Sequence, residues 1–310
     1  MASSKKMKEN PPTSLNSSEK NVLKTLAYFD VFSYPLTSEE LKIFFGGNEN
    51  PNGNIDEALE SLKEKELVFQ NQKFYQLDNS FEQIERRLKG NKLAESYLAK
   101  AKKISVFIGN FPFVRGVYIS GSLSKGYMGE DADIDYFIVT KPGRLWLART
   151  MLVMFKKLFL LNSRKYFCVN YFVDENHLEI EEKNLFTATE LVTLIPTYNS
   201  QIFEELKKQN PWVKQYYPNH PWNNQINVPL GKGSLVKKFL EFLLSGKLGE
   251  YLDKKSMMKT LTFWKNKFSY FTEKDFNNAL KSRSYISKHH PQNFQKKVLN
   301  AFEQKVNEFI

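Results

Sequence analysis

The chain has 310 residues, of which 41% are hydrophobic and 15% aromatic, which excludes a disordered protein and allows two or three domains with a sizeable core. The formal net charge is +11, and the segment 231–310 alone carries +9, from 16 Lys and Arg residues against 7 Asp and Glu residues. Such a basic segment is typical of proteins that contact RNA or another polyanion, and equally typical of a solvated lysine-rich surface.

Targeting and redox features are sparse in this sequence. The single cysteine, Cys168, lies in an apolar run, so neither a disulfide framework nor a cysteine zinc site is expected. Residues 1–17 are polar and lack the apolar core of a signal peptide, and we interpret them as a disordered arm. The longest apolar stretch, 145–161, is interrupted by Arg and Lys residues, which makes it a poor membrane span. We therefore expect a cytoplasmic protein without a membrane partner.

Residues 18–78 have the pattern of three short helices followed by two short strands. Apolar residues recur at helical spacing in 18–32 and again on one face of 54–68. Between these segments, Thr37 or Ser38 can cap a second helix, and the stretch LVFQNQKFYQL indicates a β-ribbon. This order resembles a winged helix, whose third helix usually lies in a DNA groove.

The charge of the third helix argues against DNA reading. Its exposed positions are mostly acidic, because two lysines are set against four carboxylates: Asp56, Glu57, Glu60 and Glu64. DNA phosphates would repel such a face. We therefore expect a protein-contact or regulatory role for this winged-helix-like unit.

The rest of the chain predicts a mixed α/β (α+β) fold in three further parts. Residues 79–112 indicate a connecting helix, broken or bent near Gly90. Residues 113–185 alternate strands with a helix from about 142, as in an α/β sheet domain. Residues 186–310 predict a basic, helical C-terminal region.

A loop between two apolar, strand-like runs begins with Gly121-Ser122 and ends with Asp133-x-Asp135. Residues two apart on a strand point to the same face, so the two carboxylates are expected to meet at one spot. Mg²⁺ prefers oxygen ligands and usually takes one or two carboxylates, with water and substrate phosphates at its other positions. Asp133 and Asp135 are therefore candidate catalytic residues and candidate ligands of Mg²⁺ or Mn²⁺.

The other end of the loop has residues suited to phosphate. A glycine at a strand end lets the backbone approach a phosphate closely, and the Ser122 hydroxyl can donate to its oxygens. Ser124 and Lys125 extend this candidate nucleotide-binding site, in which the lysine is a point charge beside a triphosphate.

The stretches GSLSKG, 121–126, and ADIDYFIV, 132–139, with ten residues between Ser122 and Asp133, resemble the polymerase-β-like nucleotidyltransferase superfamily, and its minimal members in particular. The resemblance covers 115–173 and extends more loosely to bacterial proteins in which a winged-helix unit precedes such a domain. It implies metal-dependent transfer of a nucleotidyl group from a nucleoside triphosphate. By position, Gly121 and Ser122 match the phosphate-binding pair, and Asp133 and Asp135 match the metal ligands.

One departure from the superfamily pattern concerns the third carboxylate, which the resemblance places on a later strand. In the expected strand 165–173 the middle position is Asn170, and the nearest acids, Asp174 and Glu175, follow the strand. Asparagine can coordinate a metal through its carbonyl oxygen, but it is neutral and a very poor base. Asn170 is therefore the candidate third-ligand position.

Two main hypotheses of function follow. The first is Mg²⁺-dependent nucleotidyl transfer to a hydroxyl acceptor, for which the sequence does not distinguish RNA, a protein side chain or a small molecule. The second is a nucleotide-binding regulatory or antitoxin-like protein with little or no turnover. A DNA-binding transcription factor would need the first unit to bind DNA despite its acidic helix. A surface hairpin with solvated acids would explain Asp-x-Asp alone, but not the Gly-Ser pair and both apolar flanks.

Overall fold

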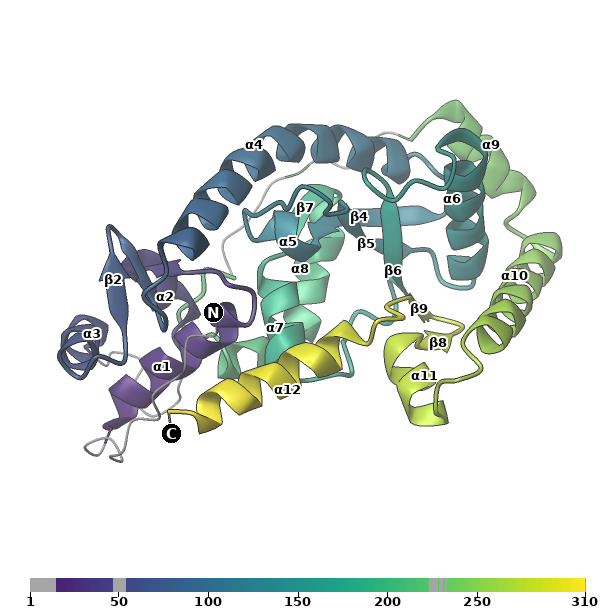
Figure 1. The fold of residues 1–310 in the computed structure, drawn as a ribbon. Helices are drawn as coiled ribbons and strands as arrows, with labels where there is room; N and C mark the ends of the chain where they lie inside the picture. Colours follow the sequence, from purple (N-terminus) through teal and green to yellow (C-terminus); the bar gives the residue numbers. More distant parts are fainter. Residues whose placement is uncertain (1–14, 47–53, 223–227, 229–230, 232, 310) are drawn as a thin grey trace.

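The computed structural model describes residues 15–46, 54–222, 228, 231 and 233–309. Most of the expected arm, 1–17, lies outside these residues. Within them the chain forms a mixed α+β fold of 12 α-helices and two β-sheets, as the sequence predicts at this coarse level (Figure 1). None of the described helices combines the length and the apolar character needed to cross a membrane.

The smaller sheet belongs to the N-terminal part of the chain. This part consists of α1 (Ser17–Asp30), β1 (Leu36–Thr37), α2 (Ser38–Phe44), α3 (Ile55–Glu64), β2 (Phe69–Asn71) and β3 (Phe74–Gln76). The three strands are antiparallel and lie in the order β1-β3-β2, so β1 adds a strand to the expected ribbon. Capping boxes begin the first two helices, with Asn16 and Glu19 at α1 and with Thr37 and Glu40 at α2.

The long helix α4 (Phe81–Gly109) connects the two sheets, as expected for 79–112, and it continues through Gly90 without a break. The glycine has another function, because a Cβ atom at this position would lie 2.2 Å from Cε2 of Tyr127. The ring of Tyr127 therefore packs directly on the α4 backbone, and Gly90 is explained by this close approach.

The larger sheet has six strands in the order β7-β4-β5-β6-β9-β8. Its central elements are β4 (Val114–Ser120), α5 (Gly121–Ser124), β5 (Asp135–Thr140), α6 (Leu145–Phe159) and β6 (Cys168–Asp174). Strands β4 and β5 are antiparallel, whereas β5 and β6 are parallel and are joined through α6.

The C-terminal part of the chain is less uniformly helical than expected. Its elements are α7 (Leu185–Val192), β7 (Ile195–Tyr198), α8 (Ser200–Gln209), the 3₁₀ helix η1 (Pro211–Gln215), α9 (Leu235–Leu243), α10 (Lys247–Lys267), α11 (Glu273–Ala279), β8 (Ser282–Arg283), β9 (Ile286–Lys288) and α12 (Phe294–Asn307). Its three strands form the two edges of the larger sheet, β7 at one edge and β9 and β8 at the other. They have two to four residues each, too few for an alternating pattern to be recognised.

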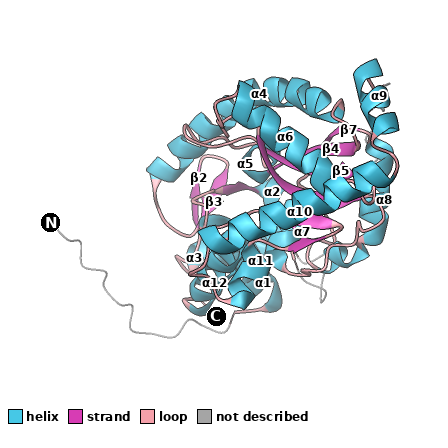
Figure 2. Cartoon of the chain, turned by 90° about the vertical axis from the view of Figure 1, so that its right-hand side faces the viewer, coloured by secondary structure: helices cyan, strands magenta, loops and turns pink. Residues whose placement is uncertain are grey.

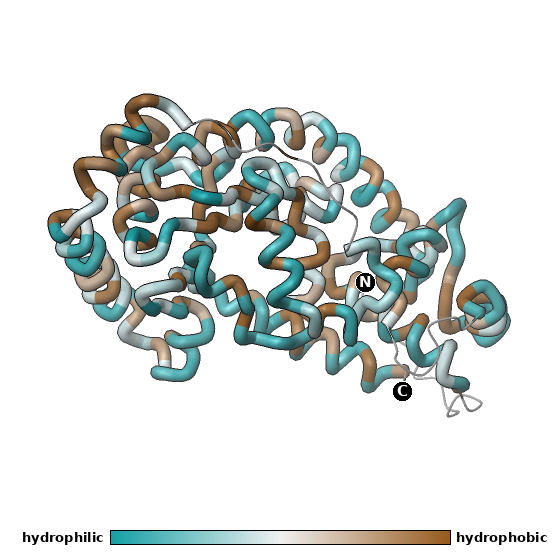
Figure 3. The backbone as a smooth tube through the Cα atoms, turned by 180° about the vertical axis from the view of Figure 1, so that it is seen from behind, coloured by the Kyte–Doolittle hydropathy of each residue, from teal (hydrophilic) through white to brown (hydrophobic). Residues whose placement is uncertain are grey.

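Each face of the larger sheet is covered by helices, as Figures 1 and 2 show. One core lies between the sheet and α4 and α6, and it includes Val117, Ile119, Tyr136 and Ile138. The opposite face, with Tyr118, Phe137 and Val139, packs against α7, α8 and η1. In Figure 3 the central strands are mostly hydrophobic, whereas the outer helices mix both characters along their length. Alternate strand residues are thus buried on opposite faces.

The N-terminal part of the chain packs on both the loop after β4 and the last helix. The hydroxyl of Tyr34 donates a hydrogen bond to the carbonyl oxygen of Lys125, at 3.3 Å, and the rings of Tyr34 and Tyr127 meet edge to face. At the other side, α1 packs against α12, where Asp30 pairs with Lys305. The segment between α1 and β1 is therefore in contact with the loop that follows the Gly-Ser pair.

Candidate functional site

Gly121 follows directly after β4 and lies against the carboxylate of Asp135. Its φ angle of +68° is in the left-handed region that favours glycine. A Cβ atom at this position would be 2.5 Å from Oδ2 of Asp135 and 3.2 Å from its Cγ, which no side chain tolerates. The absence of a side chain at position 121 therefore allows the carboxylate to reach the backbone at the strand end.

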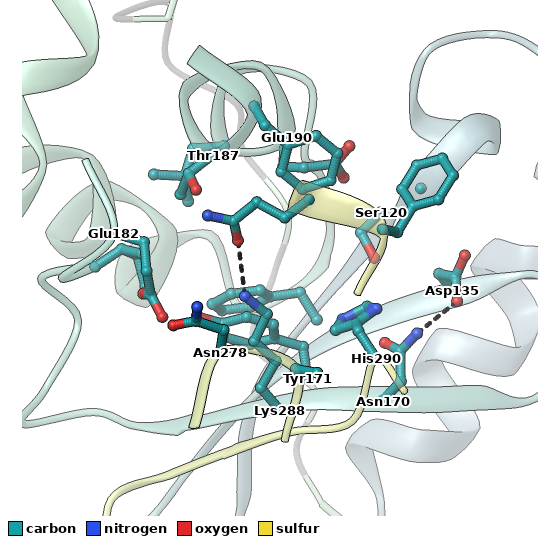
Figure 4. Close-up of a pocket in the computed structure, with 18 of the residues that line it drawn as sticks. Ser120, Asp135, Asn170, Tyr171, Glu182, Thr187, Glu190, Asn278, Lys288 and His290 are labelled. Atoms are coloured by element: carbon teal, nitrogen blue, oxygen red, sulfur yellow. Dashed lines mark hydrogen bonds between the residues drawn. The ribbon is translucent and has the colours of Figure 1, made fainter. Parts of the chain in front are cut away.

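Asp135 begins β5, between Ser120 of β4 and Cys168 of β6. Its Oδ1 accepts a hydrogen bond of 2.8 Å from Nδ2 of Asn170, so the structure brings the candidate third-ligand residue to one of the two candidate metal ligands (Figure 4). The amide nitrogen, and not the amide oxygen, faces the carboxylate. In this state Asn170 acts as a hydrogen-bond donor to Asp135.

A β-bulge in β6 orients the side chain of Asn170 toward Asp135. Tyr136 pairs with Val169 and Phe137 pairs with Tyr171, so Asn170 is an extra residue in β6. A bulge locally suspends the alternation of side chains between the two faces of a sheet. As a result, the consecutive residues Asn170 and Tyr171 both line the same cavity.

Burial raises the pKa of Asp135 to about 6, and the charges of Glu190 and Asp133 act in the same direction. Hydrogen bonds from Cys168 and Asn170 oppose this effect only in part. Burial and the nearby carboxylate also raise the pKa of the Cys168 thiol, so this cysteine stays protonated. A cation placed beside Asp135 would relieve the unfavourable charge.

The remaining sequence-predicted residues lie around this carboxylate, but they do not line the cavity. Asp133 precedes β5 and is partly buried, and its charge acts on Asp135. The Ser124 hydroxyl and the Lys125 ammonium both donate to the carbonyl oxygen of Gly121, at 2.9 and 3.0 Å. The carbonyl oxygen of Ser122 accepts from the N–H groups of Lys125 and Tyr127. The turn is therefore held by its own residues.

Glu190 of α7 is a carboxylate that the sequence analysis missed. It lines the cavity with Asp135 and pairs with Lys125, at 2.7 Å between Oε1 and Nζ. A lone Glu in a helical stretch gives no sign in the sequence that it faces a strand 55 residues earlier. The candidate phosphate-binding lysine is thus held by an internal carboxylate.

The acids at the end of β6 do not belong to this site. Asp174 pairs with Thr140 at the far end of β5, and its Oδ1 lies 2.6 Å from Nδ1 of His177. Five residues of strand separate it from the position opposite Asp135, about 17 Å along the sheet. Of the three candidates for the third ligand, Asn170 lies beside Asp135, and Asp174 and Glu175 do not.

The chemistry of the donor set fits a hard cation that has few protein ligands. Within the described ranges, no three or more His, Cys, Asp and Glu side chains are arranged to hold a metal ion. Mg²⁺ does not need such a cluster, because it commonly takes one or two carboxylates together with water and phosphate oxygens. The oxygen donors for such an ion are the carboxylates of Asp135 and Asp133 and, if the amide group of Asn170 rotates, its oxygen.

The cavity beside Asp135 has a volume of about 110 Å³ and opens to solvent. Its floor is the sheet, one wall is α7, and the other wall is the segment that leads into α12 (Figure 4). The accessible surface of the lining is mainly apolar, although 11 of its 20 residues are polar or charged, and such a mixture is found in small-molecule sites. The residues that the sequence did not associate with the site are Ser120, Phe137, Tyr171, Ile180, Glu182, Phe186, Thr187, Glu190, Leu191, Leu194, Asn278, Ala279, Lys288, His290, Asn293, Phe294 and Gln295.

Comparisons of the chain with models of protein families, with curated proteins and with solved structures found no match.

Proposed function

We propose that the protein is a metal-dependent nucleotidyltransferase that moves a nucleotidyl group from a nucleoside triphosphate to a hydroxyl acceptor. The observation that supports this most is the contact between the Gly121 backbone and the Asp135 carboxylate. A phosphate-binding turn and a metal-binding carboxylate must lie side by side for this chemistry, and here they are in contact. The two parts of the sequence that resemble the superfamily, the Gly-Ser turn and the second aspartate, therefore lie next to each other.

In the proposed reaction the acceptor oxygen attacks the α-phosphorus of the triphosphate. The new O–P bond forms as the bond from the α-phosphorus to the bridging oxygen breaks, and pyrophosphate leaves with that electron pair. The hydroxyl proton passes to a base or to water. A Mg²⁺ or Mn²⁺ ion, held by Asp133 and Asp135, would supply positive charge for the phosphate oxygens. The Gly121-Ser122 turn, with Ser124 and Lys125, would orient the triphosphate.

A regulatory protein with little turnover is the second candidate, and two observations favour it. Asn170 stands where the superfamily pattern implies a carboxylate, and it presents its NH₂ group to Asp135. Lys125 is held by Glu190 instead of being free for a triphosphate. Such a site would bind nucleotide and a metal ion without an acid to receive the proton. Glu190 is the nearest substitute, provided that Lys125 leaves it when nucleotide binds.

We also propose that residues 18–78 form a winged-helix-like unit with a protein-contact or regulatory role, in front of a central nucleotidyltransferase sheet. Their order of elements and the β1-β3-β2 sheet are those of a winged helix. The exposed face of α3 carries Asp56, Glu57 and Glu60, which disfavours DNA as the partner. This unit contacts the loop that contains Lys125, so a movement of the unit would act directly on the proposed nucleotide site.

The basic C-terminal region remains a candidate site for RNA or another polyanion. On α10 the lysines 254, 255 and 259 are exposed. If they bind RNA, the association should weaken steeply as the salt concentration rises, because each neutralised phosphate releases counterions. Salt-independent binding would instead indicate an ordinary solvated surface.

Label transfer distinguishes the two main functions. The full chain is incubated with each of the four nucleoside triphosphates, labelled at the α-phosphate, together with Mg²⁺ or Mn²⁺ and either total RNA or a small-molecule extract. Transfer of label, lost in Asp133→Asn/Asp135→Asn, supports the enzyme. Calorimetric binding of nucleotide without transfer supports the regulator. Absence of metal-dependent nucleotide binding would contradict both.

A further inference from the structure

The cavity floor contains a row of side chains that runs across three strands. Phe137 pairs with Tyr171, and Tyr171 pairs with Lys288, so the three lie side by side on one face of the sheet. The two aromatic rings are stacked, with 4.8 Å between their centroids and 18° between their planes. This row gives the cavity floor a pair of stacked aromatic rings beside an ammonium group.

Lys288 is a buried cation without an ionic partner. Its residue is only 7% exposed, and its Nζ donates to Oε1 of Gln295, a neutral oxygen, at 2.9 Å. Across the described part of the chain, no carboxylate oxygen lies within 4 Å of this ammonium. Burial lowers the pKa of Lys288, as expected for a charge removed from water.

The two glutamates of the cavity, in contrast, already have cations. Glu182 pairs with Lys281 at 3.1 Å, and Glu190 pairs with Lys125 at 2.7 Å. Each of these ion pairs is formed with a lysine that does not line the cavity. Lys281 is shared with Glu181, at 2.7 Å, and the charges of Glu182 and Glu190 also act on Lys288. Among the described lining residues, Asp135 at one end, which suits a metal ion, and Lys288 at the other, which suits an anion, have no ion-pair partner within 4 Å.

The end of the cavity at Lys288 is also where α12 begins. Asn293, Phe294 and Gln295 line the cavity, and the last two form the first turn of this 14-residue helix. The N–H groups of a first helical turn have no acceptor within the helix, and the helix dipole favours a negative charge there. The helix thus adds to the preference for an anion that the buried ammonium creates.

We propose that this cavity binds a small hydroxyl acceptor with an aromatic body and a carboxylate, the carboxylate at Lys288 and the hydroxyl toward Asp135. The role as acceptor rests on the proposed function, whereas the ligand class rests on the cavity alone. The backbones of Asp135 and Lys288 are two strands and two residues apart, about 12 Å, which suits a single aromatic compound. A carboxylate is preferred to a phosphate because the apolar walls disfavour a dianion.

The enclosure of the cavity favours a small molecule over RNA. Helix α7 stands on one side of the aromatic floor, and residues 278–279 with the start of α12 stand on the other (Figure 4). RNA and a protein loop would need an open groove along the sheet.

Binding is tested by calorimetry on the full chain with a panel of hydroxyaryl carboxylates, each compared with its neutral amide and with the matching aryl phosphate. The expected result is at least tenfold tighter binding of the carboxylate than of the amide for one or more members. This preference should disappear in Lys288→Met and persist in Lys274→Met, which removes an exposed lysine of α11. Equal binding of acid and amide, or no binding by any member, would overturn the proposal. Tighter binding of the phosphate would overturn the preference for a carboxylate.

Gln295→Glu is a second variant, designed to keep the fold. It places a carboxylate at the atom that already contacts Lys288 and so supplies the missing ionic partner internally. We expect a higher melting temperature and at least a tenfold loss of carboxylate binding. Unchanged carboxylate binding in this variant would contradict the assignment of Lys288.

The acceptor role has its own readout. Carboxylate binding that adds to nucleotide binding, with transfer of label from the α-phosphate to the bound compound, supports it. Competition between the carboxylate and the nucleoside triphosphate would overturn it and assign the cavity to the nucleotide. Carboxylate binding without transfer contradicts the acceptor role while the ligand site stands, so failure of the proposed function is distinguished from failure of the site.

Discussion

The ring of Tyr127 occupies the space that a side chain on Gly90 would need, with Cε2 only 2.2 Å from the position of a Cβ atom. The ring is held from another side by Tyr34, whose ring meets it edge to face. The N–H group of Met128 also donates to the carbonyl oxygen of Gly90 at 3.1 Å. The loop after α5 is therefore attached to α4 at a point where the helix has no side chain.

Gly90→Ala should destabilise the protein, although alanine is favoured over glycine in a helix by about 1 kcal/mol. The displaced ring makes the net effect a loss of about 1–2 kcal/mol in the free energy of unfolding. Urea unfolding measures it. In a Tyr127→Ala background the same change should become neutral or stabilising. A loss of equal size in both backgrounds would show that the ring is not the cause.

Gly121→Ala should cost about 2 kcal/mol or more and abolish metal-dependent nucleotide binding, because the methyl group would meet the Asp135 carboxylate. Gly143→Ala is the matched control. Its φ angle is also +68°, but a Cβ atom there would meet no atom within 4 Å. The difference between the two variants in urea unfolding isolates the contact with Asp135. Equal losses of stability in the two variants would show that backbone strain alone causes the effect.

Asp135→Asn should stabilise the metal-free protein at pH 8. The pKa of Asp135 in the folded state, about 6, exceeds the ordinary value of 3.8, so the folded state binds this proton more tightly than the unfolded state. The resulting stability is fully present below about pH 4 and is lost as the pH rises through 6. The variant should therefore exceed the wild type by about 1–3 kcal/mol at pH 8, with a gap that closes toward pH 4.5. A gap independent of pH, measured by urea unfolding, would contradict the raised pKa.

Asn170→Asp should lower stability without metal and raise transfer activity with it. The hydrogen bond of 2.8 Å to Asp135 would be replaced by two carboxylates, which repel each other unless they share a proton or a cation. We expect a loss of about 1–3 kcal/mol at pH 7.5, recovered on addition of Mn²⁺. Asn176→Asp, at an exposed turn after β6, introduces the same charge as a control. Stability unaffected by Mn²⁺ would contradict a shared ion.

The sequence predicts the strands that carry the site better than it predicts the cavity. Gly121 and Asp135 are close in sequence. Gly121 follows one strand with a strong apolar pattern and Asp135 begins the next, so their positions at two strand ends can be inferred. Asn170 is the candidate third position on the strand, but its orientation depends on a bulge that periodicity does not reveal. The sequence predicts a break or bend of α4 at Gly90 because local propensity contains no information about the ring of Tyr127.

The other side of the cavity could not be predicted. Lys288 lies in a strand of three residues and Glu190 in a helix, and nothing local distinguishes them from solvated surface charges. Their burial depends on where the C-terminal segment crosses the sheet. Composition showed only that this segment is basic, and most of its lysines are ordinary surface residues, unlike Lys288.

Strand β9, which carries Lys288, pairs with β6 although more than a hundred residues separate them in the chain. During synthesis the sheet therefore has an unpaired β6 edge until almost the whole protein has emerged, and such long-range pairings form slowly. Removal of residues 231–310 would remove basic surface, and it would also expose that edge, which would promote aggregation. The C-terminal segment is thus a folding element of the sheet, and point substitutions are the appropriate way to study its binding functions.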